Sequence, residues 1–397
     1  MSKVFITPHP DFIVLAKELS KSCEIITVSK EFIDALTNVD VNVIDLNSVL
    51  SQKQLISIRI DSLLLTSEIV NKLPNKSEFL PDESKSAVLL DKSGVLVADI
   101  GRRINDFVAI VKCLDSAKPD MVIVHNDVDN TTRTIALWAK ANNVPCLHIP
   151  HSIYLDTNER PKDDVHSHLS ASHSVASGPF HAEWLVNNGM KPENVFITGI
   201  PTFDKVSKKY NVDHMRRLLK VNPNFPVVTY MSSWRQDTNL LGCHTGVEDT
   251  YINFLESAKK LIADGIQVIV KCHPSGNNVS WHVSEAGKHG VRCIVTDKHL
   301  GPIVSVSNII VSYGPSNVVI ESAIMNPDCG LIAINGFYSD KEVVSISEKD
   351  DMYTAIVSEL SFVTDKSSFI KKYVSYPDGK SIDRIIKVVG EILESSS

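Results

Sequence analysis

Short apolar runs rich in β-branched residues alternate with longer amphipathic segments along most of the chain. The chain opens with an expected strand at residues 3–7, a helical pattern at 11–20 and a second strand at 24–28. The same alternation returns in the segments 121–125, 131–142 and 145–149. Buried strands separated by helices predict right-handed crossovers and a parallel sheet with helices on both faces.

A second series of the same kind follows the polar stretch 204–224. Its expected strands lie at 226–231, 267–272, 293–296, 309–312 and 331–335, and its expected helices at 247–263, from residue 316 onward and at 383–393. The predicted fold class is therefore α/β, with two Rossmann-like domains whose parallel sheets face a central cleft. We place the N-terminal domain at 1–205 and the C-terminal domain, with its closing helix, at 206–397. Residues 40–100 show no clear pattern and are expected to hold an irregular insertion.

Composition and charge exclude several classes of protein. A hydrophobic fraction of 43% provides enough apolar surface for a folded core, so a disordered chain is excluded. Lys and Arg total 40 against 47 Asp and Glu, and the resulting net charge of −7 argues against general nucleic-acid binding. The 7 cysteines are scattered without a C-x-x-C pair, so neither a disulfide framework nor a cysteine zinc site is expected. The sequence shows no leader pattern or membrane-length apolar run, and we expect a cytoplasmic protein with at most peripheral contact at the inner face of a membrane.

Candidate binding residues follow the strands of the C-terminal domain, where the loops of a parallel sheet gather around ligands. Lys271 and His273 end a buried type of strand, and Pro274 and Ser275 come directly after them. A histidine fixed by the next proline can donate to a phosphate, and the lysine adds positive charge. The alternative is that the His-Pro dipeptide is a plain turn that ends the strand.

A second loop, residues 311–321, runs from a strand through a Gly-Pro turn into a helix. Free backbone N–H groups and the helix dipole favour a phosphate at such an N-terminus, although Ser316 can alternatively be a plain helix cap. Glu321 lies further into the helix, where its carboxylate can accept ribose hydroxyls. The nucleotide-binding residues expected in this loop are Tyr313, Gly314, Pro315, Ser316, Asn317 and Glu321.

A third loop follows the first strand of the C-terminal domain and carries Ser232, Ser233, Trp234, Arg235 and Asp237. Its hydroxyls and its guanidinium suit a carboxylate or a phosphate. The alternative is an interdomain hinge in which Trp234 is a packing residue.

Polar residues of the N-terminal domain also follow two expected strands and face the same cleft. Asp127, His151 and Glu159 are the candidates for acid and base chemistry. Asp127 begins a D-x-D pattern, the metal motif of another transferase architecture, but such short acidic patterns are common by chance and nothing downstream supports that fold. The segment 165–175 is rich in histidine, but its spacing does not present three imidazoles on one helical face. We therefore expect no metal and no other cofactor.

Together these loops resemble those of the two-domain GT-B transferases that use cytidine-activated donors to build bacterial surface polysaccharides. The resemblance runs from residue 125 to 321. Residues 199–204 resemble the G-x-P-x-x-D signature, and residues 228–237 resemble the strand and W-R-x-D loop of CDP-glycerol glycerophosphotransferases. His273 with Pro274 resembles the His-Pro motif on the donor nucleotide, and residues 312–317 resemble the hydroxyl-rich phosphate loop.

The chain also resembles the retaining β-Kdo transferases, through residues 125–127 and 159–161. This resemblance implies a glycosyltransferase of lipopolysaccharide O-antigen or capsule synthesis, which moves a sugar, Kdo in the favoured case, from a CMP-activated donor to an oligosaccharide or lipid-linked glycan acceptor. It implies Glu159 as an acceptor-side acid/base residue and His273 as a donor-phosphate residue. These enzymes use a carboxylate nucleophile, and here Ser232 and Ser233 stand at its expected place, with Asp237 as the nearest carboxylate.

Other functions are compatible with the same predicted fold. One alternative is polyol-phosphate transfer from a CDP-linked donor such as CDP-glycerol. A second, suggested by the two serines in place of an acid, is a non-catalytic subunit that binds a glycan or a nucleotide. A nucleotide-sugar 2-epimerase shares the fold but is a weaker rival, because carboxylates for a UDP site are not evident in the sequence.

Overall fold

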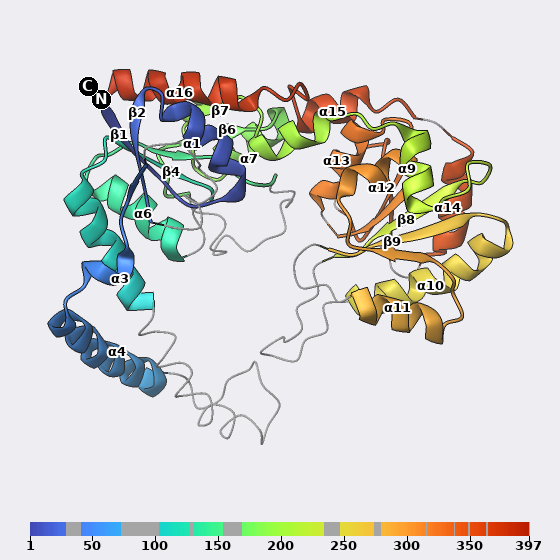
Figure 1. Ribbon diagram of the computed structural model, residues 1–397, viewed down its shortest axis with the longest axis horizontal. Helices are drawn as coiled ribbons and strands as arrows, with labels where there is room; N and C mark the ends of the chain where they lie inside the picture. Colours follow the sequence, from blue (N-terminus) through green and yellow to red (C-terminus); the bar gives the residue numbers. More distant parts are fainter. Residues whose placement is uncertain are drawn as a thin grey trace.

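Two parallel β-sheets, each covered by helices, make up the part of the chain that a computed structural model describes (Figure 1). The described residues are 1–28, 41–72, 103–126, 130–153, 169–233, 247–273, 279–314, 316–336, 338–347, 350–362 and 364–396. Within these ranges, the first sheet has the strand order β3-β2-β1-β4-β5-β6-β7 and the second the order β10-β9-β8-β11-β12-β13. The prediction of two Rossmann-like α/β domains is confirmed.

The first sheet is built on strands whose side chains are apolar on both faces. All four residues of β4 are buried, because helices cover both sides of this central strand. The strands are β1 (Ser2–Ile6), β2 (Cys23–Thr27), β3 (Val41–Val43), β4 (Met121–Val124), β5 (Cys146–His148), β6 (His173–Ala176) and β7 (Val195–Ile197). The helical segments are η1 (Pro10–Phe12), α1 (Ile13–Leu19), α3 (Leu46–Val49), α4 (Gln52–Lys72), residues 103–117, α6 (Asn130–Ala141), α7 (Pro179–Asn187), η3 (Pro192–Asn194), α8 (Pro201–Asp204) and η4 (Lys205–Ser207).

The second sheet repeats this arrangement and is followed by helices that return toward the first. Its strands are β8 (Val227–Met231), β9 (Gln267–Lys271), β10 (Ile294–Thr296), β11 (Ile309–Tyr313), β12 (Gly330–Ile334) and β13 (Val344–Ile346). Its helices are α9 (Val212–Leu219), α10 (Val247–Ala263), α11 (Val279–Lys288), α12 (Leu300–Val306), α13 (Asn317–Met325), α14 (Met352–Leu360), α15 (Ser367–Tyr373) and α16 (Ser381–Ser395).

Several segments differ from the sequence-based expectation, β13 and α9 among them, and two show why. Residues 41–72, expected to be irregular, form β3, α3 and α4. The pattern of α4 is unclear because Ile58 is buried while Ile56 and Ile60 are 60% and 53% exposed. The strand β6 was not expected, because His173 and Ser174 interrupt its apolar run. Ser174 is nevertheless fully buried, since its hydroxyl pairs with the ring of His148 at 3.0 Å.

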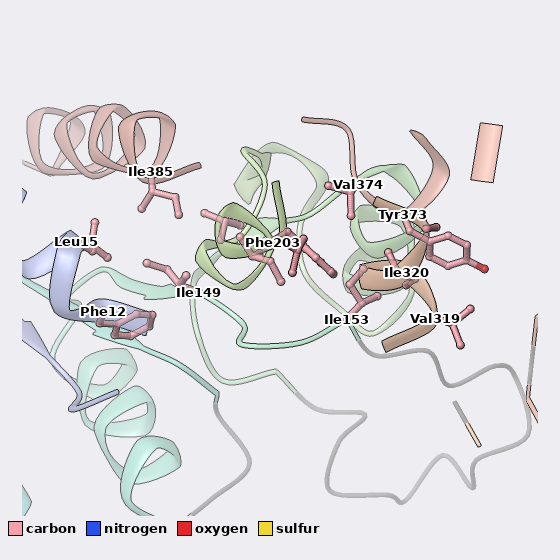
Figure 2. Close-up of a cluster of buried hydrophobic side chains, with 14 of the residues drawn as sticks. Phe12, Leu15, Ile149, Ile153, Phe203, Val319, Ile320, Tyr373, Val374 and Ile385 are labelled. Carbon is pink, nitrogen blue, oxygen red and sulfur yellow. The ribbon is translucent and has the colours of Figure 1, made fainter. Parts of the chain in front are cut away.

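A continuous apolar cluster joins the two domains and fixes their arrangement (Figure 2). Ile385 of α16 packs above Leu15 of α1, and Phe203 of α8 lies between these helices and Ile320 of α13 (Figure 2). The N-terminus of α16 is held by Asp204, whose carboxylate accepts from the Ser381 hydroxyl at 2.6 Å and from its backbone N–H at 3.1 Å. The closing helix therefore ties the end of the chain to the first domain.

A close crossing of α7 and α15 adds a second tie between the domains. The Ser177 hydroxyl donates to the Tyr373 carbonyl at 2.7 Å. A Cβ on the neighbouring Gly178 would lie 2.7 Å from that same carbonyl oxygen, so this approach requires a glycine.

Candidate functional site

Each sheet reverses its strand order at one point, and these two switch points carry the candidate site. In the first sheet the reversal lies between β1 and β4, and in the second between β8 and β11. His9 and Asp11 follow β1, and His125 follows β4. Ligands of open α/β sheets bind in the crevice at such points, because the loops on either side diverge there.

Three imidazole rings meet at the switch point of the first sheet. His9 and His125 stack with their centroids 4.7 Å apart and their planes at 22°. His151, which follows β5, lies 5.6 Å from His9 and 6.2 Å from His125, again between ring centroids. We call these three residues the histidine cluster. Thr7 holds one member in place, since its hydroxyl lies 3.1 Å from His125 Nδ1.

Asp11 anchors the histidine cluster to the segment that leaves the first domain. Its carboxylate accepts from the Thr202 hydroxyl at 3.0 Å and pairs with the Lys205 ammonium. Burial by itself would raise the pKa of Asp11, but the hydrogen bond and the charge of Lys205 outweigh it and hold this pKa below its ordinary value. Asp11 therefore presents a fixed negative charge beside His9, whose Nδ1 lies 3.7 Å from the carboxylate.

The first turn of α13 faces this cluster from the second domain. Its cap is Ser316, whose hydroxyl accepts from the Val318 backbone N–H at 3.4 Å. Asn317 Oδ1 accepts a 3.2 Å hydrogen bond from the backbone N–H of Ile153, two residues after His151. The preceding Gly314 has a φ of +69° and open space where a Cβ would stand, so the backbone can approach a ligand there. The N-terminus of α13 and the loop of His151 therefore lie side by side.

Glu321 lies one turn further along α13. Burial raises the pKa of its carboxyl to about 7, and the negative charge of Asp11 adds to this effect. The helix α13 packs against η4, which begins with Lys205, the residue that pairs with Asp11. Two carboxyl groups, one from each domain, thus influence each other across the junction.

The ends of β8 and β9 complete the second switch region. Lys271 is 7% exposed, and its ammonium donates to the Cys272 carbonyl. Burial lowers the pKa of this lysine. The Ser232 hydroxyl lies 2.9 Å from His282 Nε2, so it is held by the core of its own domain. His273 is partly buried directly after β9, and Ser233 follows Ser232.

The remaining expected site residues lie outside the described residues. They are Asp127, Glu159, Arg235, Asp237, Pro274, Ser275 and Pro315. Of the expected residues that are described, the structure brings His151, Asn317, Ser316 and Glu321 to the domain junction. The assignment of chemical roles to these residues stays a prediction.

Sequence analysis missed the polar residues after the first strand and at the end of the first domain. These are Thr7, His9, Asp11, Thr202 and Lys205. A usable signal was present, because the sequence TPHPD follows an apolar strand just as His125 and His151 follow theirs. Applying the strand-end rule to β1 as well would have found His9 and Asp11.

The described residues contain neither a metal-binding group nor a membrane-spanning helix. In the described ranges no group of three or more His, Cys, Asp or Glu side chains is arranged to hold a metal ion. No helix among the described residues is long and apolar enough to cross a membrane.

Comparison with known proteins identifies a family over most of the chain. A family model described as UDP-N-acetylglucosamine 2-epimerase matches residues 84–390. The sequence matches no curated protein significantly.

Solved structures of low sequence identity share the fold. The UDP-GlcNAc 2-epimerase of Neisseria meningitidis, bound to UDP-GlcNAc, aligns with a TM-score of 0.55 and 16% identity over 98% of this chain and 100% of that chain. A putative UDP-N-acetylglucosamine 2-epimerase of Listeria monocytogenes gives 0.57 and 12% over 100% and 97%. The UDP-GlcNAc 2-epimerase of Methanocaldococcus jannaschii, in complex with UDP-GlcNAc and UDP, gives 0.51 and 14% over 98% and 99%.

These comparisons overturn the resemblance drawn from the sequence. The expected CMP-Kdo-dependent glycosyltransferase is wrong, and neither the CDP-glycerol alternative nor the non-catalytic subunit is supported, because the matching family is an epimerase family. A glycan acceptor was expected only because a transferase was expected, so it is no longer supported. The His-Pro turn and the hydroxyl-rich helix start misled the assignment because both suit any nucleotide phosphate and specify neither the base nor the reaction.

Proposed function

The chain belongs to the UDP-N-acetylglucosamine 2-epimerase family, and we propose that it inverts the configuration at carbon 2 of a nucleotide-linked sugar bound between its two domains. The match of the family model over residues 84–390 carries this proposal, because it spans strands and helices of both domains. The solved relatives from Neisseria meningitidis and Methanocaldococcus jannaschii are described as bound to UDP-GlcNAc. We take UDP-GlcNAc as the first substrate to test.

The chemistry of the junction fits such a reaction. Inversion at carbon 2 breaks a C–H bond and forms it again on the other face, so the site must both accept and donate a proton near neutral pH. Glu321, with a pKa of about 7, titrates in this range. The histidine cluster supplies imidazole rings from the first domain at the same junction.

The nucleotide is proposed to bind on the second domain. The positive end of the α13 helix dipole suits the diphosphate, with Ser316, Asn317 and the open Gly314 turn around it. Lys271, His273, Ser232 and Tyr313 lie at the ends of the neighbouring strands β8, β9 and β11 and are proposed to line the same region. The sugar then extends toward the first domain. No metal or other cofactor takes part in this proposal.

Turnover of UDP-GlcNAc tests the proposal. The protein is incubated with UDP-GlcNAc, with EDTA present in a parallel sample, and the anomeric protons are followed by NMR. The expected result is a new signal for UDP-N-acetylmannosamine, the carbon-2 epimer, that grows to a constant ratio and is unaffected by EDTA. An unchanged UDP-GlcNAc spectrum would contradict the proposed reaction on this substrate, and loss of turnover in EDTA would contradict its independence of metal.

A further inference from the structure

Tyr338 is a buried residue behind the turn that leads into α13. It lies between β12 and β13, and only 6% of it is exposed. Its hydroxyl donates to the backbone carbonyl of Ser316, the cap of α13, at 2.8 Å. Burial raises the pKa of Tyr338 well above its ordinary value, so the phenol keeps its proton and acts as a donor near neutral pH.

The segment that contains Tyr338 holds both ends of this turn. At one end the Gly314 backbone N–H donates to the carbonyl of Ile334, the last residue of β12, at 2.7 Å. At the other end the Ser316 carbonyl accepts from the Tyr338 hydroxyl and, at 3.2 Å, from the Val319 backbone N–H. A carbonyl oxygen has two lone pairs, and here both are used. The turn is therefore fixed by the chain around β12 as well as by α13.

The bond from Tyr338 also sets the direction of a peptide N–H. The described residues contain no cis peptide bond, and in a trans peptide the C=O and the N–H point in opposite directions. A Ser316 carbonyl that points at Tyr338 therefore directs the Asn317 N–H away from the buried phenol. The next two N–H groups, of Val318 and Val319, bond to Ser316. The Asn317 N–H has no acceptor in the described part of the chain, so a ligand at this turn can accept from it.

The aromatic core around Tyr338 keeps its hydroxyl in place. Between centroids, its ring lies 5.9 Å from that of Phe369 and 6.0 Å from that of Tyr373, and both residues belong to α15. The Ser345 hydroxyl holds the backbone by donating to the Tyr338 carbonyl at 2.8 Å. Tyr338 is thus fixed by packing before any ligand binds, and groups that are already ordered cost less free energy on binding.

We propose that Tyr338 is a positioning residue of the nucleotide site, which fixes the peptide between Ser316 and Asn317 so that the Asn317 N–H donates to the diphosphate. This inference rests on the proposed function, which puts the diphosphate at this turn. Tyr338 acts through the peptide, without touching the nucleotide, and takes part in no covalent step. Without its hydroxyl the peptide can rotate, and a carbonyl oxygen turned toward the ligand repels a phosphate.

The test is calorimetric binding of UDP and of uridine to the wild type and to Tyr338→Phe, which keeps the ring and removes the hydroxyl. We expect about a tenfold loss of UDP affinity, because a hydrogen bond to a charged group contributes at least about this factor. The affinity for uridine, which has no phosphate, should stay the same. With UDP-GlcNAc as substrate, KM should rise by a similar factor with kcat little changed, because the nucleotide is bound alike in the ground state and the transition state.

Tyr373→Phe is the matched control. It removes a hydroxyl of the same aromatic core that donates to Asp340 at 2.7 Å and not to the turn, so this variant should bind UDP like the wild type. The inference is overturned, and the epimerase stands, if Tyr338→Phe binds UDP as tightly as the wild type, if it loses uridine affinity to the same degree, or if Tyr373→Phe loses as much. If the wild type neither binds UDP nor turns over UDP-GlcNAc, the proposed function falls and takes this inference with it.

A measurement on the wild type tests the same contact without any variant. In protein that carries isotope-labelled asparagine, the NMR signal of the Asn317 amide proton should move downfield when UDP is added and stay in place when uridine is added. A signal that UDP leaves in place would overturn the inference, even if Tyr338→Phe does not fold.

Discussion

The side-chain oxygen of Asn317, in the first turn of α13, accepts a 3.2 Å hydrogen bond from the backbone N–H of Ile153 in the other domain. Ile153 is itself buried, in the apolar cluster that also contains Val319 and Ile320 of α13 (Figure 2). The hydrogen bond between Asn317 and Ile153 therefore lies next to apolar packing between the same two segments. The loop of His151 is positioned by the same helix that we propose for the diphosphate.

Asn317→Ala tests this coupling of the two domains. Loss of one hydrogen bond of about 1 kcal/mol corresponds to roughly a fivefold change in an equilibrium constant. We therefore expect KM for the nucleotide sugar to rise about fivefold, with the thermal midpoint little changed. Steady-state kinetics and thermal unfolding measure the two quantities. A KM equal to that of the wild type would show that the contact does not support binding.

Glu321→Gln tests the carboxyl group whose pKa is raised to about 7. A raised folded-state pKa contributes stability that is complete below the unfolded value of 4.5 and is lost as the pH rises through about 7. The glutamine variant has no such loss, so at pH 8 it should be more stable than the wild type by on the order of 3 kcal/mol, and at pH 4 nearly equal to it. Urea unfolding at both pH values measures the difference.

Two further variants sharpen this prediction. Glu391→Gln removes an exposed carboxyl of α16 and should show no comparable pH dependence. Asp11→Asn removes the charge that helps to raise the Glu321 pKa, so the loss of stability should be smaller and complete at a lower pH. Equal stability of Glu321→Gln and the wild type at pH 8 would contradict the account.

His181 should make the first domain sensitive to acid. Its ring is fully buried in α7, and burial, with the charge of His148 as a second cause, lowers its pKa to about 3. A lowered histidine pKa contributes stability that is present above the unfolded value of 6.5 and is lost as the pH falls toward 3. The expected loss from this group is about 1.4 kcal/mol per pH unit within that window.

His181→Gln should therefore flatten the dependence of stability on pH between about 6 and 4. Urea midpoints at several pH values measure the slope for the variant, the wild type and His289→Gln, whose ring contacts Glu256 at the surface. If the slopes of His181→Gln and the wild type coincide, the buried ring is not the source of the acid sensitivity.

Asp204→Ala should weaken the attachment of α16. The carboxylate satisfies the hydroxyl and the N–H of Ser381, and helix caps of this kind are worth about 1–2 kcal/mol. We expect this loss in the free energy of unfolding, measured by urea denaturation. Asp383→Ala, in the first turn of the same helix but exposed, is the control and should cost much less. A similar loss in both variants would contradict the specific role of Asp204.

The architecture could be predicted from the sequence because local patterns encode it. Strands such as β4 and β9 are apolar runs bounded by turns, and their alternation with helices leaves few topologies open. The strand β6 was not predicted because Ser174 is polar. Its burial is favourable only because the neighbouring strand β5 supplies His148 as a hydrogen-bonding partner. The tie between Asp204 and Ser381 joins residues too distant in sequence for any local pattern to show.

The candidate site was predicted only in part for the same physical reason. Strand-end loops pointed to His151, Asn317 and Glu321, because chain position determines which residues follow a parallel strand. The fixed negative charge of Asp11 could not be predicted from the sequence. It depends on an ion pair with Lys205, which lies far away in the sequence at the end of the first domain. The reaction itself could not be deduced from phosphate loops, because these bind the part of the substrate that many reactions share.

We propose that this protein breaks and re-forms the C–H bond at carbon 2 of a nucleotide sugar. The most direct test is incubation of UDP-GlcNAc with the protein in D2O, followed by mass spectrometry of the recovered sugar. The expected result is a gain of one deuterium, located at carbon 2, in both UDP-GlcNAc and its 2-epimer. A sugar recovered without deuterium at carbon 2 would contradict it.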